Sequence, residues 1–350
     1  MLIEIREESL VLRETLTAVT SSCHNIASEL AGEEAGMVYF SGSGTSYHAA
    51  LASEYLMSSL STVPTNSIPA SEFDSWVRAS PSGTSVVVII SQSGESVDAL
   101  SVLGAAKKKR IRSIGITNTP KSTLAETSDF AVITRAGPER AITATKTFVT
   151  CLAAGYLLTL EMVNAWEALA GSVQELANLR RELESSPSIV RETIRRSTDQ
   201  ADVLAKRFVN RSLFFLLGHG GGYATALEGA LKLKESCNVM AEGHAAREFL
   251  HGPMQLVDEN TPVFMISLRS YHESLAILSE SFKRLGAPII EVSDTEASTS
   301  PQDHLHVEPG LSDPLSPLGF IVPIQLFAYY SAVSRGLDPD KPTKLSKVVK

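Results

Sequence analysis

Two short runs of serine, threonine and glycine each follow an apolar run typical of a buried strand and lead into a helical pattern. The longer run is Ser91-Gln92-Ser93-Gly94-Glu95-Ser96, which comes directly after the apolar residues 86–90. Small hydroxyls, a glycine that admits a close approach and the orphan amides of a helix N-terminus suit an anion the size of a monophosphate. An ordinary serine-capped turn has the same composition, so this motif by itself leaves both interpretations open.

The second run, Gly42-Ser43-Gly44-Thr45-Ser46, follows the apolar residues 37–40 and adds the hydroxyls of Thr45 and Ser46 at the head of another helix. Because the carboxyl ends of parallel strands form one edge of a sheet, the two runs strengthen each other as a phosphate site. Tyr47 stands where a dinucleotide fingerprint has its third glycine or alanine, and no Gly-Lys-Ser or Gly-Lys-Thr occurs. The motifs therefore do not indicate dinucleotide or nucleoside triphosphate binding.

Ionisable side chains recur along one predicted helix later in the chain. Glu228, Lys232 and Glu235 are four and three residues apart, so they line one helix face and can form a paired acid and base row. A solvated ion pair on a helix surface has the same spacing, and the residues alone do not separate the two. His251 precedes Gly252-Pro253, where we expect a second helix to end in a turn; it is either a proton-transfer group or a partner of the helix dipole.

One ungapped alignment pairs two halves of the chain at a constant offset of 176 residues. It places the glycines of residues 42–44 on those of residues 218–220, and the apolar residues 86–91 on residues 262–267. The second copy lacks the phosphate chemistry, because Arg269-Ser270-Tyr271 stands at the positions of Ser93-Gly94-Glu95. We therefore predict that one copy binds an anion and that the other performs a different task.

Each copy alternates short apolar strands with helices, which predicts an α/β fold of two tandem, doubly wound parallel-sheet domains of flavodoxin-like form, related by duplication. The predicted parts are a helical lead-in over residues 1–30, a first domain over 31–160, a helical linker over 161–206, a second domain over 207–335 and a tail over 336–350. The helical pattern of the linker is broken at Ser185-Ser186-Pro187, where we place a hinge.

Composition and charge narrow the class of protein. The 350 residues include 39 acidic and 31 basic side chains, and the resulting net charge of −8 offers no general attraction for nucleic acid. The basic residues 107–110 read as the solvated last turn of a helix. Cys23, Cys151 and Cys237 stand far apart and indicate neither a zinc site nor a disulfide framework.

No segment reads as a signal for export or membrane insertion. The first eight residues are acidic rather than basic, and the apolar stretch 148–160 is shorter than the roughly 20 residues that span a bilayer. We therefore expect a cytoplasmic protein in a reducing compartment, without a membrane partner. None of the motifs requires a metal or another cofactor.

At these motifs the sequence resembles the sugar isomerase (SIS) domain family, in particular its tandem-domain branch. That branch includes the isomerase half of glucosamine-6-phosphate synthase and the related aminosugar-phosphate deaminases, and the resemblance extends over nearly the whole chain. The matched motifs are Gly44-Thr45-Ser46-Tyr47, residues 91–96, Ala144-Thr145-Lys146, residues 227–235, His251-Gly252-Pro253 and Leu345-Ser346-Lys347.

The resemblance implies a role for each matched residue. The sugar phosphate would be held by Thr45, Ser46, Ser91, Gln92, Ser93 and Ser96, with Gly44 and Ser346 lining the site. Glu235 would move a proton between C1 and C2, and Lys347 would contact the open-chain sugar and can form a Schiff base with its carbonyl. His251 would act in ring opening, in the active site of the neighbouring subunit of a homodimer. Glu228 and Lys232 would line the same site, Lys232 with a catalytic part.

The resulting hypothesis is a homodimeric deaminase and isomerase that converts glucosamine 6-phosphate into fructose 6-phosphate and ammonia. Leu2 stands where the family's synthases carry a nucleophilic cysteine, so we expect deamination rather than glutamine-dependent amination. Abstraction of a proton next to a carbonyl suits a buried carboxylate with a lysine beside it. A galactosamine-6-phosphate deaminase, a fructosamine-6-phosphate deglycase and a phosphosugar aldose–ketose isomerase are alternatives with the same phosphate turn. A non-catalytic phosphosugar sensor is the alternative of another class.

Overall fold

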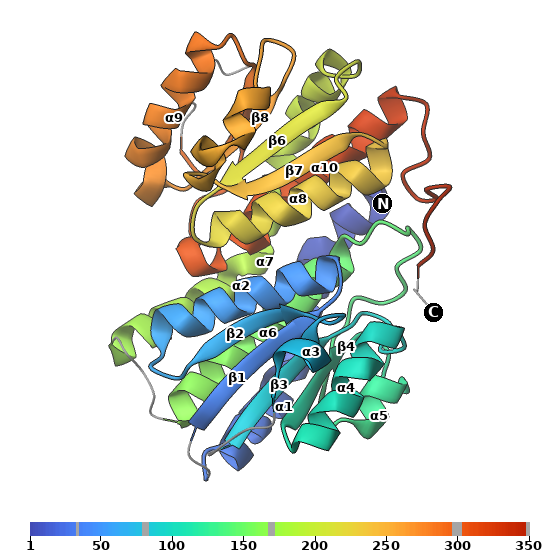
Figure 1. Ribbon diagram of the computed structural model, residues 1–350, viewed down its shortest axis with the longest axis vertical. Coiled ribbons are helices and arrows are strands. Elements are labelled where there is room, and N and C mark those ends of the chain that lie inside the picture. The colour runs from blue at the N-terminus through green and yellow to red at the C-terminus, as the bar shows by residue number, and fades with distance from the viewer. Residues whose placement is uncertain (33–34, 79–83, 167–171, 296–302, 348–350) are drawn as a thin grey trace. The chain divides into compact units, whose positions relative to one another are not determined.

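The computed structural model describes residues 1–32, 35–78, 84–166, 172–295 and 303–347, and its contacts divide the chain into two compact units. The N-unit comprises Leu10–Glu139, Lys146–Ser185 and Ser346–Lys350. The C-unit comprises Met1–Ser9, Arg140–Thr145 and Ser186–Leu345. Figure 1 shows the ribbon, coloured from blue at the N-terminus to red at the C-terminus.

The N-unit is built on a five-stranded parallel sheet with the order β2-β1-β3-β4-β5. The strands are β1 (Ala35–Gly42), β2 (Thr65–Pro69), β3 (Thr84–Ile90), β4 (Arg112–Thr117) and β5 (Phe130–Ile133). The central strand β3 is a nearly continuous apolar run because helices cover both of its faces. This strand order is that of flavodoxin-like folds, and the predicted fold class is confirmed for the first copy.

Helices pack on both faces of this sheet. On one face lie α2 (Thr45–Leu60) and α6 (Lys146–Ala165); the other carries α3 (Phe73–Trp76), α4 (Val97–Lys109) and α5 (Thr123–Thr127). The closeness of α2 and α6 depends on Gly155, because a Cβ at that residue would lie 2.4 Å from the hydroxyl oxygen of Ser53. The α2 N-terminus and the α4 N-terminus therefore both lie at the carboxyl edge of the sheet.

The C-unit repeats the architecture of the N-unit. Its parallel sheet has the order β10-β9-β8-β6-β7, with β6 (Leu213–Gly218), β7 (Met240–Ala245), β8 (Val263–Ser267), β9 (Ile289–Ser293) and β10 (His304–His306). Numbered within the copy and read from the β7 edge, this order is again 2-1-3-4-5. The predicted duplication is thus present in the topology as well as in the sequence.

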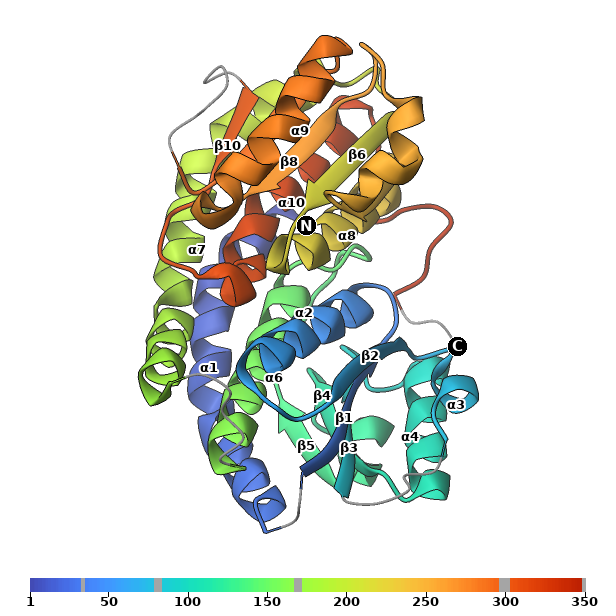
Figure 2. The ribbon, with the colours of Figure 1, turned by 60° about the vertical axis from the view of Figure 1, so that its left-hand side comes forward.

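Two helices cover one face of the second sheet and a third covers the other, as Figure 2 shows for α9 lying against β8. The first face carries α8 (Gly221–Cys237) and α10 (Pro317–Ser334), which pack closely on each other. The other face carries α9 (His272–Arg284) and two short 3₁₀ turns, η1 (Glu248–His251) and η2 (Pro253–Leu256). Further 3₁₀ turns are η3 (Arg269–Tyr271) and η5 (Asp313–Leu315).

Two long helices contribute residues to both units. As predicted, the lead-in forms one helix, α1 (Leu2–Leu30), whose first turns belong to the C-unit. The helix α7 (Val173–Arg207) runs through Pro187, so the predicted break in helical structure is wrong. A proline inside a helix costs about 3 kcal/mol, and burial of Leu183, Ile189 and Val190 on either side offsets that cost. The boundary between the units falls between Ser185 and Ser186.

The predicted second helix ending at His251 is present only as the short 3₁₀ helix η1 (Glu248–His251). Residues 240–245 form the edge strand β7, paired with β6 over its whole length, and a 3₁₀ turn follows. This strand lacks the β-branched residues that mark a strand in sequence. It contains Gly243, which lies so close to α8 that a Cβ would come within 2.5 Å of the Ala226 backbone.

Two helices of the described chain, α6 and α10, have the length and apolar composition of a membrane-spanning segment. In α6, 89% of the most apolar window is buried inside the protein, and in α10 the share is 78%. An apolar helix in a protein core has the same composition. The two helices are accounted for by their packing in the N-unit and the C-unit.

Candidate active site

The serine-rich turn after β3 is held together by its own side chains. The Ser91 hydroxyl accepts a hydrogen bond from the Gly94 amide at 3.1 Å and lies 3.4 Å from the Ser96 hydroxyl. The Ser93 hydroxyl accepts from the Glu95 amide at 3.2 Å. Gly94 has φ +65°, a conformation that glycine adopts without strain. The turn thus presents hydroxyl groups directly before the N-terminus of α4.

Glu95 fixes this turn to the start of α5, a function that sequence reasoning did not assign to it. Its carboxylate accepts hydrogen bonds from the Thr123 amide at 2.7 Å and from the Thr123 hydroxyl at 3.0 Å. A Cβ at Gly94 would lie 2.1 Å from the Ser122 hydroxyl oxygen, so the two segments are in close contact. A rigid turn of this kind can bind an anion without first being ordered.

The structure brings the second predicted turn close to the first. The Ser43 hydroxyl donates a hydrogen bond to the Asp98 carboxylate of α4 at 3.2 Å, which links the two turns. Gly44 precedes α2 with φ +54°, and Thr45 and Ser46 are its first helical residues, both partly exposed. The hydroxyl-bearing residues predicted to hold phosphate therefore all lie at the carboxyl edge of the N-unit sheet.

Gln92 connects these turns to a cavity of about 570 Å³ in the N-unit. Its carbonyl oxygen accepts hydrogen bonds from the Asn118 amide and the Thr117 hydroxyl, both at 3.1 Å, so the end of β3 is tied to the end of β4. The cavity wall carries mostly polar side chains, among them those of Gln92, Asn118, Arg135, Glu14 and Glu139. A polar cavity beside a hydroxyl-rich turn suits a small hydroxylated ligand.

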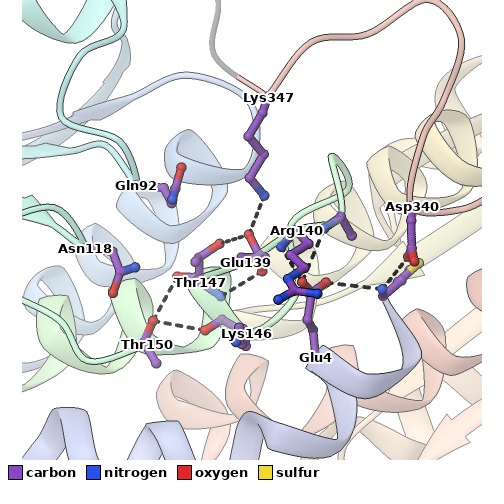
Figure 3. A network of polar contacts seen from close by, with 12 residues as sticks. Glu4, Gln92, Asn118, Glu139, Arg140, Lys146, Thr147, Thr150, Asp340 and Lys347 are labelled. Carbon is purple, nitrogen blue, oxygen red and sulfur yellow. Dashed lines mark hydrogen bonds and ion pairs between the residues drawn. The ribbon is translucent and has the colours of Figure 1, made fainter. Parts of the chain in front are cut away.

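Lys347 is held by a buried carboxylate of the N-unit. Its ammonium group lies 2.6 Å from the Glu139 carboxylate, which is fully buried, whereas the lysine side chain is 26% exposed. Figure 3 shows Lys347 directed at Glu139 with Thr147 on the other side. The Thr147 hydroxyl and amide donate to the same carboxylate at 2.6 and 3.2 Å. The end of the chain is therefore tied to the N-unit, and the predicted neighbour Ser346 is exposed beside it.

Thr147 belongs to the first turn of α6, directly after the motif Ala144-Thr145-Lys146. Lys146 itself is buried, and its carbonyl oxygen accepts a hydrogen bond from the Thr150 hydroxyl at 2.9 Å. The motif thus begins the helix whose N-terminus holds Glu139. Glu139 was not identified from the sequence, although it lies only a few residues before this motif.

In the C-unit, Glu228, Lys232 and Glu235 form the predicted row on one face of α8. The Lys232 ammonium lies 3.2 Å from the Glu228 carboxylate and 2.7 Å from the Glu235 carboxylate. The side chains of Lys232 and Glu228 are fully buried and that of Glu235 is 20% exposed. The alternative of a solvated surface ion pair is therefore wrong.

The burial of this row follows from the packing of α8 between β6 and α10. Gly229 makes the close approach possible, since a Cβ there would come within 2.8 Å of both Ile324 and Leu216. Burial by itself lowers the pKa of the Lys232 ammonium, but the carboxylates of Glu228 and Glu235 outweigh it and raise that pKa above its usual value. Lys232 is thus a fixed positive charge between two acidic groups.

Glu235 is the member of the row that faces open space. It lines a C-unit cavity of about 510 Å³, together with Ser236, Asn238 and residues 336–338 and 341–345. A carboxylate held at one oxygen by a buried ammonium, and open to a cavity, can take a proton from a bound carbon acid.

His251 ends the turn η1 with an exposed side chain. Within the described residues, no hydrogen bond or ion pair joins His251 to Glu235. The described residues also contain no group of three or more metal-binding side chains. Cys23, Cys151 and Cys237 are all buried, and burial raises the pKa of Cys23 and of Cys151 to about 12, so both remain neutral thiols.

Comparison with known proteins assigns both repeats of the chain to one family. The family model of the SIS domain matches residues 33–161 and again residues 208–335, one match for each repeat. The chain belongs to the SIS domain family, and the fold agrees with that assignment.

The relatives of the chain are enzymes of phosphosugar and aminosugar metabolism. It is 37% identical to the isomerizing glutamine–fructose-6-phosphate aminotransferase of Methanothermobacter thermautotrophicus over 356 residues, and 36% identical to that of Aquifex aeolicus over 352 residues. Each match covers 100% of this chain and 57% of the relative. The chain therefore spans little more than half the length of these curated relatives.

Two solved structures are similar over nearly their whole length. One is the C-terminal domain of glucosamine-fructose-6-phosphate aminotransferase from Francisella tularensis, with a TM-score of 0.88, 30% identity and 97% of each chain covered. The other is the glucosamine-6-phosphate deaminase from Thermotoga maritima, with a TM-score of 0.74 and 26% identity, covering 98% of this chain and 99% of that one.

Proposed function

We propose that this protein is an aminosugar-phosphate deaminase and isomerase that converts glucosamine 6-phosphate and water into fructose 6-phosphate and ammonia. The observation that carries the proposal is the row on α8, where Glu235 faces a cavity and is paired with the fully buried Lys232. Desolvating a charged row is costly, and a protein that only senses a ligand has no need of a proton acceptor there. The non-catalytic sensor is therefore the weaker alternative.

The phosphate group is bound by the two turns of the N-unit in this proposal. Backbone amides at the heads of α2 and α4 and the hydroxyls of Thr45, Ser46, Ser91, Ser93 and Ser96 supply the hydrogen bonds, with Gln92 beside them. These groups bind the phosphate end of the substrate and do not distinguish the configuration at C2 to C4. Galactosamine 6-phosphate and fructosamine 6-phosphate therefore remain alternative substrates for the same turns.

The proton is moved by Glu235 in this proposal. His251 assists opening of the hemiacetal, and Glu235 then takes the proton from C2 of the open-chain aldehyde and returns it to C1. The nitrogen at C2 becomes part of an imine, which water hydrolyses to the ketone of fructose 6-phosphate with release of ammonia. The Lys232 ammonium holds the Glu235 carboxylate in position, and the Lys347 ammonium stabilises the charge that develops at the carbonyl oxygen.

A second candidate function is the isomerase half of an amination reaction. It is favoured by the 37% identity with an isomerizing aminotransferase over 100% of this chain. Deamination is favoured by the structural similarity to the glucosamine-6-phosphate deaminase from Thermotoga maritima, which has a TM-score of 0.74 and 26% identity. Both activities use the same proton transfer. A phosphosugar aldose–ketose isomerase without a nitrogen substrate is the third.

Ammonia release from hexosamine 6-phosphates tests the proposal. We expect wild-type protein to release ammonia from glucosamine 6-phosphate and Glu235→Gln to lose about 10²- to 10⁴-fold in kcat. The matched control is Glu280→Gln, the same change at a side chain of α9 that is 61% exposed. Ammonia release from another hexosamine phosphate alone would identify that sugar as the substrate. Isomerisation without ammonia release would favour the aldose–ketose isomerase. Phosphosugar binding without any turnover would favour the non-catalytic sensor.

The proposed enzyme is a cytoplasmic homodimer in which His251 acts in the partner's active site. The exposed position of His251 on a surface turn supports this arrangement. Mixing equal amounts of unfolded Glu235→Gln and His251→Asn chains before refolding should restore about a quarter of wild-type activity, because about half of the dimers are then mixed and each of these contains one intact site. If the mixture stays as inactive as its parents, His251 does not act across subunits.

A further inference from the structure

The glycine turn before α8 has the same backbone form as the turn before α2. Gly44 has φ 54° and ψ −124°, and Gly220 has φ 54° and ψ −128°. In each turn the amide three residues after the glycine donates back to its carbonyl, at 2.9 Å for Tyr47 and 3.1 Å for Tyr223. The second copy has therefore kept the backbone of the first turn, although its hydroxyl side chains are gone.

A carboxylate of the chain itself occupies the second turn. One oxygen of Asp313, which begins η5, accepts a hydrogen bond from the Gly221 amide at 3.0 Å. The other oxygen accepts from the Tyr271 hydroxyl at 3.1 Å. The His219 ring packs edge-on against Tyr271, with ring centroids 4.3 Å apart. By the offset of the repeat, Gly221 corresponds to Thr45, a predicted phosphate-binding residue.

The glycines of this turn are matched to Asp313. A Cβ at Gly220 would lie 2.3 Å from the Asp313 carboxylate, and a Cβ at Gly221 would lie 2.3 Å from the Asp313 carbonyl oxygen. A threonine at the position of Gly221, as in the first copy, would collide with the segment that carries the carboxylate. The helix N-terminus has no acidic residue in its own first turn, so Asp313 supplies the negative charge from elsewhere in the chain.

We propose that residues 219–222 form a second anion-binding turn, closed by Asp313, whose carboxylate takes the place that a ligand's phosphate group takes in the first copy. The chain then has one open phosphate site and one that its own side chain fills. The closure keeps phosphate monoesters out of the C-unit and ties α8, which carries Glu235, to the segment before α10. If Asp313 only caps the helix, its removal lowers the stability and phosphate does not restore it.

Phosphate titration of Asp313→Ala tests this proposal, with inorganic phosphate as the probe. We expect the variant to bind one more phosphate per chain than the wild type, by calorimetry or phosphorus NMR. Its melting temperature should fall in chloride buffer, and phosphate should recover about half or more of the loss, because a ligand of the native state stabilises it. Asp313→Ser, which retains a small cap and vacates the same space, replaces the alanine variant where that one does not fold.

A matched control is Asp258→Ala in the same unit. The Asp258 carboxylate accepts hydrogen bonds from the Asn260 amide and the Thr261 hydroxyl, both at 2.8 Å. It does not contact a glycine turn of the kind formed by residues 219–222. This variant should lose stability without recovery by phosphate. A folded Asp313 variant with no additional phosphate site would overturn the proposal. The inference rests on the phosphate function proposed for the first turn, which is measured separately: loss of the wild-type site in Ser91→Ala/Ser93→Ala tests that function alone.

Discussion

The Lys347 ammonium and the Glu139 carboxylate form an ion pair 2.6 Å long between residues 208 positions apart in the chain. The carboxylate is fully buried, and the Thr147 amide and hydroxyl also donate to it. Breaking a buried pair by removing one partner costs more than breaking an exposed one, because it leaves a desolvated charge. Glu139 therefore fixes where the lysine amine lies.

We expect Glu139→Gln to lower kcat by about 10²-fold, because a misplaced reacting group loses that much rate, with a smaller change in KM. If Lys347 forms the Schiff base that the family resemblance implies, borohydride trapping of that adduct, followed by mass spectrometry, should decline in parallel. Glu139→Asp keeps the charge and should retain part of both signals. Unchanged activity in Lys347→Met would show that the lysine has no part in the mechanism. Full trapping in Glu139→Gln would contradict only the proposal that Glu139 positions the lysine.

Replacement of Lys232 should destabilise the protein strongly. Lys232→Met leaves Glu228 buried without its partner, and we expect a loss of about 3–5 kcal/mol in the free energy of unfolding, measured by urea denaturation. The control is Lys234→Met on the exposed side of α8, which should change stability by less than about 0.5 kcal/mol. Adding Glu228→Gln to Lys232→Met should recover part of the loss. Equal effects at positions 232 and 234 would contradict the buried arrangement.

The contact between α2 and α6 gives a test of packing. Gly155→Ala places a methyl group 2.4 Å from the Ser53 hydroxyl oxygen, and overpacking of this kind costs about 1–3 kcal/mol. Removing that oxygen leaves the Ser53 Cβ 3.4 Å away, an ordinary contact. The double variant Ser53→Ala/Gly155→Ala should therefore be more stable than the sum of the single effects predicts, by at least about 0.5 kcal/mol in a thermal double-mutant cycle.

His306 should make the C-unit sensitive to acid. Burial lowers the pKa of His306 from its usual value of 6.5, and Arg196 and His304 lower it further. His306 therefore binds a proton more readily in the unfolded chain than in the folded protein. The contribution of the neutral His306 to the free energy of unfolding is complete above pH 6.5 and is lost as the pH falls through the lower pKa of the folded state. His306→Gln should flatten the fall in melting temperature below pH 6.5. The control Val203→Gln, at a side chain of α7 that is 55% exposed and does not titrate, should follow the wild-type profile.

The elements with strong local patterns were predictable from the sequence. The helix over residues 2–30 and the paired glycine turns follow from apolar periodicity and from the constant offset of the repeat. The edge strand over residues 240–245 was missed because its small and polar residues carry no strand signal. Its pairing with β6 decides its conformation. The continuous helix through Pro187 was missed because burial outweighs a local preference.

The candidate site divides in the same way. The spacing of Glu228, Lys232 and Glu235 predicted a shared helix face, and the distances on α8 confirm it. Spacing could not indicate that the row is buried, because its burial depends on the packing of α10 and on the absence of a side chain at Gly229. Glu139 and Asp313 were missed for a related reason, since Lys347 and Gly221 lie far from them in sequence and no local motif marks either carboxylate.

The charges of the row on α8 do not cancel. With both carboxylates ionised, Glu228, Lys232 and Glu235 together carry one net negative charge. A proton that arrives on one carboxylate brings the row to electrical neutrality. In the proposed reaction, the row is therefore electrically neutral while Glu235 holds the substrate's proton, and it carries one negative charge before and after.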